Sequence, residues 1–131
     1  MTDAPLTTEQ REGGTQFAPK FDASGLLTAV VVDHASGKVL VVAHMNRDAL
    51  DATLASGQVH FWSRSRGQLW MKGETSGHVL TVESVMVDCD QDALVIRAHP
   101  AGPTCHTGAP SCFYRRVEQG NDGPVLVKVN T

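Results

Sequence analysis

Two apolar runs joined by a polar turn decide the fold: Leu26-Leu-Thr-Ala-Val-Val-Val32, then Asp33-His-Ala-Ser-Gly-Lys38, then Val39-Leu-Val-Val-Ala43. The outer runs are rich in β-branched residues, which favour strands. The segment between them contains aspartate, serine and glycine, which are typical of tight turns. The sequence therefore predicts a β-hairpin whose strands lie in the core.

A short helix is predicted directly after this hairpin, from Arg47 to about Ser56. Asn46 can accept hydrogen bonds from the first turn, and Gly57 can end the helix in a left-handed conformation. Three apolar residues are expected on its buried face: Ala49, Leu50 and Leu54. Further strands are predicted at residues 59–63, 79–87 and 93–98.

The length of 131 residues fits one compact domain. Residues 1–20 are polar and show neither a helical nor a strand period, which predicts a flexible N-terminal extension. Residues 21–116 would form the domain, and residues 117–131 a C-terminal tail. After Pro100 the composition is typical of loops. We expect a single small domain, mostly β and α+β by content.

The composition excludes several function classes. Eleven Lys and Arg against fourteen Asp and Glu give a net charge of -3, so a nucleic-acid partner is not expected. No apolar run is long enough to span a membrane, and the N-terminus lacks the apolar core of a signal peptide. Three cysteines cannot all pair, which favours free thiols or metal ligands in a reducing compartment. We expect a soluble cytoplasmic protein.

The segment Asp88-Cys-Asp-Gln-Asp92 is the first of three with a high density of reactive groups. In a flat strand its three carboxylates would share one face and repel one another. A hard divalent cation would relieve that repulsion, but the outer carboxylates can reach one ion only if the backbone bends. Without a cation, the segment would be a solvated acidic turn between two strands.

The second segment is Pro103-Thr-Cys-His-Thr-Gly-Ala-Pro-Ser-Cys112. Cys105 and Cys112, with Cys89, make three thiolates, which suit a catalytic zinc with one open position better than a closed structural site. His106 could instead be a fourth ligand and close the site. Without zinc, the three cysteines would be small buried apolar side chains, or Cys105 and Cys112 would form a disulfide on oxidation.

The third segment, residues 61–78, concentrates groups that bind phosphate and purine. Its cations are Arg64, Arg66 and Lys72, and its hydroxyls and glycine amides add donors. Tryptophan can stack on a purine. A phosphorylated substrate is therefore expected, although a polar hairpin with a solvated basic face has the same pattern.

Together these segments resemble the phosphoribosyl-AMP cyclohydrolase family over about residues 21–116. The chain departs from the family's pattern at two places. Ala43-His44 stands where a bulkier apolar or aromatic pair is common, and Met71 stands where a basic residue is common. The motifs that carry the resemblance are Met45-Asn46, Trp62-Ser-Arg-Ser-Arg66, Trp70, Lys72-Gly-Glu-Thr-Ser-Gly-His78, Asp88-Cys-Asp-Gln-Asp92, Pro103-Thr-Cys-His-Thr-Gly108 and Ser111-Cys-Phe-Tyr-Arg115.

The resemblance implies a strongly bent mixed sheet and an intertwined homodimer. It implies zinc shared across the dimer, on Cys89 of one chain and Cys105 and Cys112 of the other, and magnesium on Asp88, Asp90 and Asp92. The chain is too short to hold also the pyrophosphohydrolase domain fused to some family members, so a stand-alone enzyme is expected. From the chemistry of residues 61–78, the expected substrate contacts are Trp62, Ser63, Arg64, Ser65, Arg66, Lys72, Glu74, Thr75 and Ser76.

The family reaction, part of histidine biosynthesis, adds water to C6 of the adenine ring of N1-(5-phosphoribosyl)-AMP and breaks the N1–C6 bond. Zinc would activate that water. His106 and His78 are the candidates for the general base, because a neutral imidazole can take a proton near pH 7. Two further functions stay open: a zinc-stabilised binding module without turnover, and a phosphohydrolase centred on the aspartates.

Overall fold

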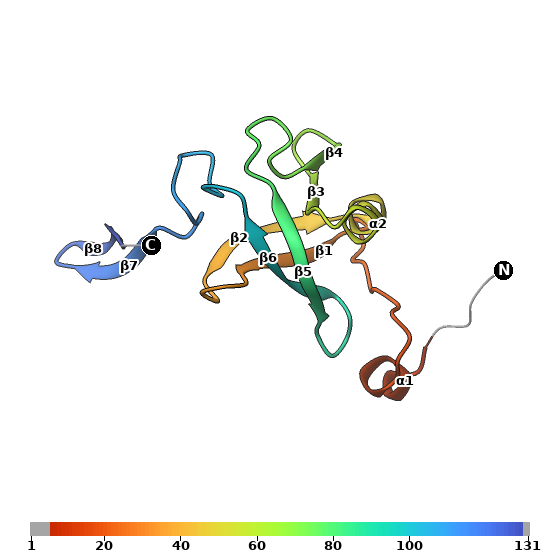
Figure 1. Ribbon diagram of the computed structural model, residues 1–131. Coiled ribbons are helices and arrows are strands. Elements are labelled where there is room, and N and C mark those ends of the chain that lie inside the picture. The colour runs from red at the N-terminus through yellow and green to blue at the C-terminus, as the bar shows by residue number, and fades with distance from the viewer. Residues whose placement is uncertain (1–5, 130–131) are drawn as a thin grey trace.

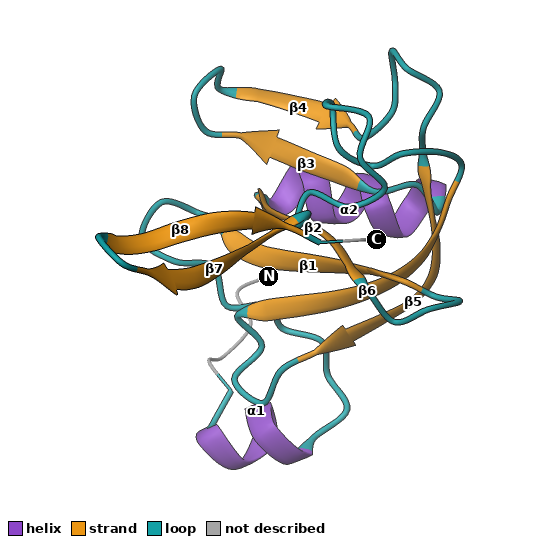
Figure 2. Ribbon diagram, turned by 90° about the vertical axis from the view of Figure 1, so that its left-hand side faces the viewer, coloured by secondary structure: helices purple, strands orange, loops and turns teal. Residues whose placement is uncertain are grey.

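The computed structural model describes residues 6–129 and is mostly β (Figures 1 and 2). In chain order the elements of these residues are α1 (Thr8–Gly13), β1 (Leu27–Asp33), β2 (Val39–Met45), α2 (Arg47–Ser56), β3 (His60–Ser63), β4 (Gln68–Met71), β5 (Leu80–Val87), β6 (Ala93–Pro100), β7 (Arg115–Gly120) and β8 (Gly123–Lys128). No helix of this part of the chain is long and apolar enough to cross a membrane.

A four-stranded mixed sheet in the order β2-β1-β6-β5 forms the centre of the molecule. The predicted hairpin is confirmed as the antiparallel pair β1–β2, whereas β1 and β6 run parallel. The strands at the two edges each shift register once, between Val31 and Val32 in the β1–β2 pair and between Val82 and Ser84 in the β5–β6 pair. Such bulges bend and twist a sheet locally, so the mixed, bent sheet matches the expectation.

The core lies on one face of this sheet. Alternate residues of β1 and β6 are buried there, because successive side chains of a strand point to opposite faces: Leu27, Ala29 and Val31 from β1, and Leu94, Ile96 and Ala98 from β6. Helix α2 and β3 cover this layer with Ala49, Leu50 and Phe61. The core thus joins the predicted hairpin to segments distant in the sequence.

Helix α2 has the predicted bounds and caps. The Asn46 side chain accepts the Ala49 N–H at 2.9 Å, and Gly57 ends the helix with φ 72°. Leu54, however, is 51% exposed, and Thr53 is buried in its place. The Thr53 hydroxyl donates to the Ala49 carbonyl at 2.8 Å and accepts the His60 N–H at 2.9 Å, so a hydrogen-bonded threonine joins helix and strand.

The C-terminal part differs from the expectation of a loop after Pro100. Strands β7 and β8 form an antiparallel hairpin that projects from the body (Figure 1), and the boundary expected at residue 116 falls inside β7. The side chains of this hairpin do not alternate clearly between buried and exposed, and many of them are exposed. The sequence therefore lacks the pattern of a buried strand. The hairpin β3–β4 likewise includes a strand, β4, that the sequence did not predict.

The N-terminal segment contains helix α1, which the sequence did not predict. Thr7 and Gln10 form a capping box, in which each side chain bonds the backbone N–H of the other residue. This local pattern was available in the sequence, but the helix buries no side chain and so shows no apolar period. Residues 1–5 of the expected extension, and residues 130–131 of the expected tail, lie outside the described residues.

Candidate active site

Two loops at one end of the central sheet form the candidate site. The first, residues 72–78, follows β4, and the second, residues 101–112, follows β6. Gly73 lets the first loop fold back on itself: its φ is +86°, and a Cβ there would lie 2.4 Å from the carbonyl carbon of His78. A Cβ on Gly102 would lie 2.6 Å from the His78 ring. The His78 ring therefore packs directly against the start of the second loop.

The two loops and the β3–β4 hairpin line an open pocket of about 390 Å³. It brings together eight of the residues singled out in the sequence: Arg66, Lys72, Glu74, Thr75, Ser76, His78, Cys105 and His106. Two of the three cations, two of the hydroxyls, both histidines and one cysteine thus line one cavity, although they come from segments about thirty residues apart. Its wall contains Lys72 near Trp70, with the ammonium 5.7 Å from the indole ring centre.

Four predicted substrate contacts, Trp62, Ser63, Arg64 and Ser65, do not line this pocket. They lie at the end of β3 and in the turn to β4. The Ser63 hydroxyl accepts the backbone N–H of Arg66 at 3.3 Å and its Nε–H at 3.5 Å. In the single chain, this serine therefore orients Arg66, which does line the pocket.

The second loop holds Cys105 and Cys112 close enough to shift each other's pKa. The Thr107 hydroxyl donates to Cys105 Sγ at 3.1 Å and, with help from the positive charge of Lys72, lowers the pKa of that thiol. Burial and the neighbouring Cys105 raise the pKa of Cys112. The lowered pKa of Cys105 favours its thiolate, which is the form that binds metal.

Backbone contacts fix the second loop to β2. The Cys112 N–H donates to the Leu40 carbonyl at 2.8 Å, and the buried Ser111 hydroxyl donates to the Val39 carbonyl at 2.7 Å. A tight turn closes the loop itself, because the Cys105 N–H donates to the Ala109 carbonyl at 3.1 Å. Cys112 is thus held by the core sheet, and Cys105 by a turn within the loop.

Cys89 lies at the opposite end of strand β6 from Cys105 and Cys112. It is exposed in the turn between β5 and β6, before β6 begins, whereas Cys105 follows the end of β6. The eight residues of β6 span about 23 Å at a rise of about 3.3 Å per residue. Within the described residues, no group of metal-ligating side chains contains the three cysteines together. One chain alone does not assemble the three-thiolate set.

The three aspartates do converge. Asp88, Asp90 and Asp92 each offer a carboxylate oxygen within 4.8 Å of the others, because the backbone bends here as the metal hypothesis requires. The Asp88 carboxylate accepts the N–H groups of Asp92 and Ala93 at 3.0 and 3.1 Å. Oxygen ligands at this spacing suit a hard divalent cation after small adjustments.

The close carboxylates perturb one another. A hydrogen bond with Asp90, then one with Asp88, raises the pKa of Asp92 to about 6. The pKa of Asp88 is lowered: burial raises it, but hydrogen bonds from Asp92 and from the backbone outweigh burial. Below about pH 6 one proton is therefore shared within the turn, as expected for like charges held together without a cation.

Two buried polar residues near the sites were not identified from the sequence as functional residues. Thr104 is 2% exposed and lines the pocket, and its hydroxyl has no hydrogen-bond partner among the described residues. Gln91 is 5% exposed in the aspartate turn, with φ 62°. Both lie inside motifs that stand out in the sequence, but nothing in a local pattern shows that a threonine or glutamine will be buried.

Sequence comparison relates this chain to known proteins. Residues 41–114 match the family described as Phosphoribosyl-AMP cyclohydrolase. A protein of that name from Rhizorhabdus wittichii is 58% identical over 92% of this chain and 95% of its own length. Another of the same name, from Sphingopyxis alaskensis, is 64% identical over 84% of this chain and 87% of its own. The matched region contains the pocket, all three cysteines and the aspartate turn, and the chain belongs to the phosphoribosyl-AMP cyclohydrolase family.

Proposed function

We propose that this chain hydrolyses the adenine ring of N1-(5-phosphoribosyl)-AMP between N1 and C6, a step of histidine biosynthesis in the cytoplasm. The product would be the ring-opened phosphoribosylformimino aminoimidazole carboxamide ribotide. The pocket carries the proposal, since it places a cysteine, two histidines and two cations around one cavity. The family match supports the same reaction.

Substrate binding would use the charge of the pocket. Arg66 and Lys72 supply cations for phosphate oxygens, and the hydroxyls of Thr75 and Ser76 add hydrogen-bond donors. The Glu74 carboxylate can accept a hydrogen bond from a ribose hydroxyl. The substrate carries a phosphate at each end, so we assign Trp62, Ser63, Arg64 and Ser65, beside the pocket, to its outer part.

The residues fit a zinc ion shared between two chains. Cys105 and Cys112 are adjacent, and Cys89 of the partner subunit would complete three thiolates in a homodimer. Zinc bound there would act as a Lewis acid that lowers the pKa of coordinated water. Because the two halves of this site lie at opposite ends of β6, a symmetric dimer would form two such sites.

A pocket histidine would act as the general base and then as the general acid. His106 follows Cys105 directly and lines the cavity, so its imidazole can take a proton from the attacking water and return it to N1 of the leaving ring. His78 lines the opposite loop and is the second candidate for the base. Magnesium on Asp88, Asp90 and Asp92 would hold a substrate oxygen or order the turn.

A direct assay tests the proposed reaction. Zinc-loaded protein is incubated with phosphoribosyl-AMP while product absorbance and free phosphate are followed together. Ring opening that Cys105→Ser abolishes would support the proposal, and the exposed Asp51→Asn on helix α2 serves as a control that keeps activity. Phosphate release without ring opening would favour a phosphohydrolase, and no turnover would favour a binding module.

Mixed dimers test the shared site. Cys89→Ser and Cys112→Ser should each be inactive, but random exchange of equal amounts gives heterodimers in which one of two sites is intact. About a quarter of the wild-type activity should then return, since roughly half of the dimers are mixed. No recovery after proven subunit exchange would place the site within one chain.

Variants of the two histidines test the general base. His106→Ala should lower kcat by about 10²-fold or more with zinc content unchanged, which is the usual scale for this role. His78→Ala should have the smaller effect on kcat. Loss of zinc from His106→Ala would make His106 a fourth ligand, and the reverse order of effects would make His78 the base.

A further inference from the structure

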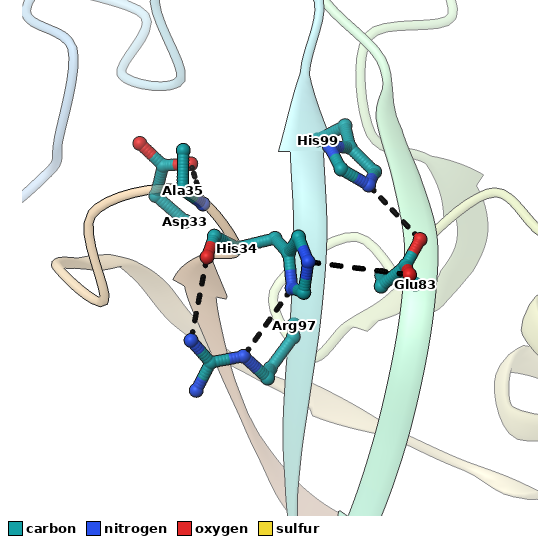
Figure 3. A network of polar contacts seen from close by, with 6 residues as sticks. All are labelled: Asp33, His34, Ala35, Glu83, Arg97 and His99. Carbon is teal, nitrogen blue, oxygen red and sulfur yellow. Dashed lines mark hydrogen bonds and ion pairs between the residues drawn. The ribbon is translucent and has the colours of Figure 1, made fainter.

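Three potential metal ligands from separate segments gather outside the candidate active site (Figure 3). His34 follows β1, Glu83 lies in β5 and His99 in β6, and their ligating atoms all lie within 4.8 Å of one another. His99 Nε2 is 3.0 Å from one Glu83 carboxylate oxygen, and His34 Nε2 is 4.0 Å from the other. The two imidazole rings meet edge to face, with centres 5.0 Å apart.

The sheet builds this cluster through a bulge. In the β5–β6 pair Val82 lies opposite Ala98 and Ser84 opposite Arg97, so Glu83 is the extra residue without a cross-strand partner. Bulges re-aim side chains, and here the carboxylate reaches both imidazoles. On the other side of β6 the His34 N–H continues the ladder, donating to the Ala98 carbonyl at 2.8 Å.

We propose that His34, Glu83 and His99 bind a divalent transition-metal ion, for which Zn²⁺ is the best match. Two imidazoles and one carboxylate are the donors of open zinc sites, which keep further positions for water. The three side chains are 41–53% exposed, so an ion can reach them from solvent. Tetrahedral ligand atoms about 2.1 Å from zinc lie about 3.4 Å apart, between the 3.0 and 4.0 Å spacings present.

Arg97 hydrogen-bonds His34 and so affects how readily His34 can bind an ion. Its Nε–H donates to His34 Nδ1 at 3.4 Å, and its Nη2–H to the His34 carbonyl at 3.3 Å. The first contact favours the tautomer with the proton on Nε2, the atom that must ligate. Binding therefore moves that proton to Nδ1 through solvent and breaks the Nε contact, while the bond to the carbonyl can remain. Arg97 thus competes with the ion.

Histidine side-chain NMR tests the site one residue at a time. Zn²⁺ is titrated into the zinc-loaded protein while long-range ¹H–¹⁵N spectra follow its six histidines. The rings of His34 and His99 should shift together, saturate, and end with the proton on Nδ1. The response should persist in Cys105→Ser, which separates it from the proposed active site. If neither ring responds, the three residues form only a polar network.

Variants sharpen the test. Glu83→Gln and His99→Gln should lose the saturable shift, whereas His44→Gln, a half-buried histidine of β2 outside the cluster, should keep it. Arg97→Met keeps the apolar stem and removes the competing donor, so it should reach half-saturation at a lower Zn²⁺ concentration. Weaker binding by folded Arg97→Met, or an unaltered response in Glu83→Gln, would contradict the proposal.

Discussion

A buried hydroxyl without a hydrogen-bond partner among residues 6–129 distinguishes Thr104 from the other residues of the pocket wall. A buried hydroxyl without a partner costs about 1–3 kcal/mol, so the folded chain bears this cost where the substrate would bind. A hydrogen bond from the substrate would recover it. The hydroxyl is therefore expected to contribute to catalysis and to lower the stability of the free protein.

Thr104→Val should separate these two effects. Valine has the same shape and no hydroxyl, so the free energy of unfolding of the free protein should stay equal or rise, while kcat/KM falls about tenfold. Thr104→Ser keeps the hydroxyl and should keep most of kcat/KM. Urea unfolding and steady-state kinetics measure both quantities. Full activity in Thr104→Val would mean that the substrate does not use this group.

The raised pKa of Asp92 predicts that the unfolding free energy depends on pH. Its pKa is raised from 3.8 to about 6 in the fold, so its contribution to stability is complete below about pH 4 and is lost as the pH rises through 6. Without divalent cations, the unfolding free energy should therefore fall over this range. Mg²⁺ should reverse the fall by neutralising the repulsion.

Asp92→Asn should flatten this pH dependence and the Mg²⁺ effect, whereas Asp51→Asn, exposed on helix α2, should leave both unchanged. Chemical denaturation at several pH values, with EDTA or Mg²⁺, provides the measurement. A stability that rises between pH 4 and 6 in both Asp92→Asn and the wild type would assign the pH dependence to other groups.

At the scale of elements, the local signals were sufficient for β1, β2 and α2. Asn46 and Gly57 fix the ends of α2, and the turn from Asp33 to Lys38 fixes the hairpin. Thr53 replaced Leu54 in the core because its hydroxyl found partners in the helix and in β3, and such pairing depends on tertiary contacts.

The candidate site was predicted in its residue types and only partly in its geometry. The convergence of His78 and Cys105 depends on the antiparallel pairing of β5 with β6, which sets Leu80 opposite Pro100, and on two loops that meet at Gly102. The two strands and the turn between them were predicted from the sequence, but a single sequence does not show that the loops beyond these strands fold toward each other. Arg64 and Arg66 look equivalent in the sequence, but the β3–β4 turn brings only Arg66 to the pocket.

One residue, Gln91, joins the aspartate turn to the N-terminal segment through its side chain and its backbone carbonyl. The Gln91 amide accepts the Ala18 N–H at 2.8 Å and donates to the carbonyls of Arg11 and Gln16 at 3.0 and 3.3 Å. The Gln91 carbonyl also accepts the Lys20 N–H. The segment after α1 is therefore held against the turn that carries Cys89.

Gln91→Gly should release this segment. The loss of buried hydrogen bonds is expected to lower the unfolding free energy by about 1–3 kcal/mol, and the Ala18 amide should exchange rapidly with solvent. Gln91→Ala loses the same side-chain bonds but keeps the strain of about 1 kcal/mol at φ 62° that glycine relieves, so it should be less stable than Gln91→Gly. An Ala18 amide that stays protected in Gln91→Gly would contradict this role.

At the scale of the whole molecule, exposed apolar residues flank both halves of the proposed shared zinc site. Met86 and Val87 precede the turn with Cys89, and Phe113 follows Cys112. Large apolar side chains at these positions are typical of a surface that another chain covers. Their placement agrees with the proposed dimer.

Phe113→Asp should therefore weaken the dimer and lower zinc content with it. Leu54→Asp is a matched control, because Leu54 on helix α2 is 51% exposed and Phe113 53%, but Leu54 does not flank a cysteine. Sedimentation at several protein concentrations measures association. Equal association of Phe113→Asp and wild type would show that this face is free.

The length of β6 has a further consequence for biosynthesis in the cell. Because this strand keeps Cys89 apart from Cys105 and Cys112, a newly made chain on the proposed arrangement holds at most two thiolates for any one zinc ion. Assembly would then precede metal loading, and single chains would compete poorly for scarce zinc. Through its length, the strand would restrict tight zinc binding to paired subunits.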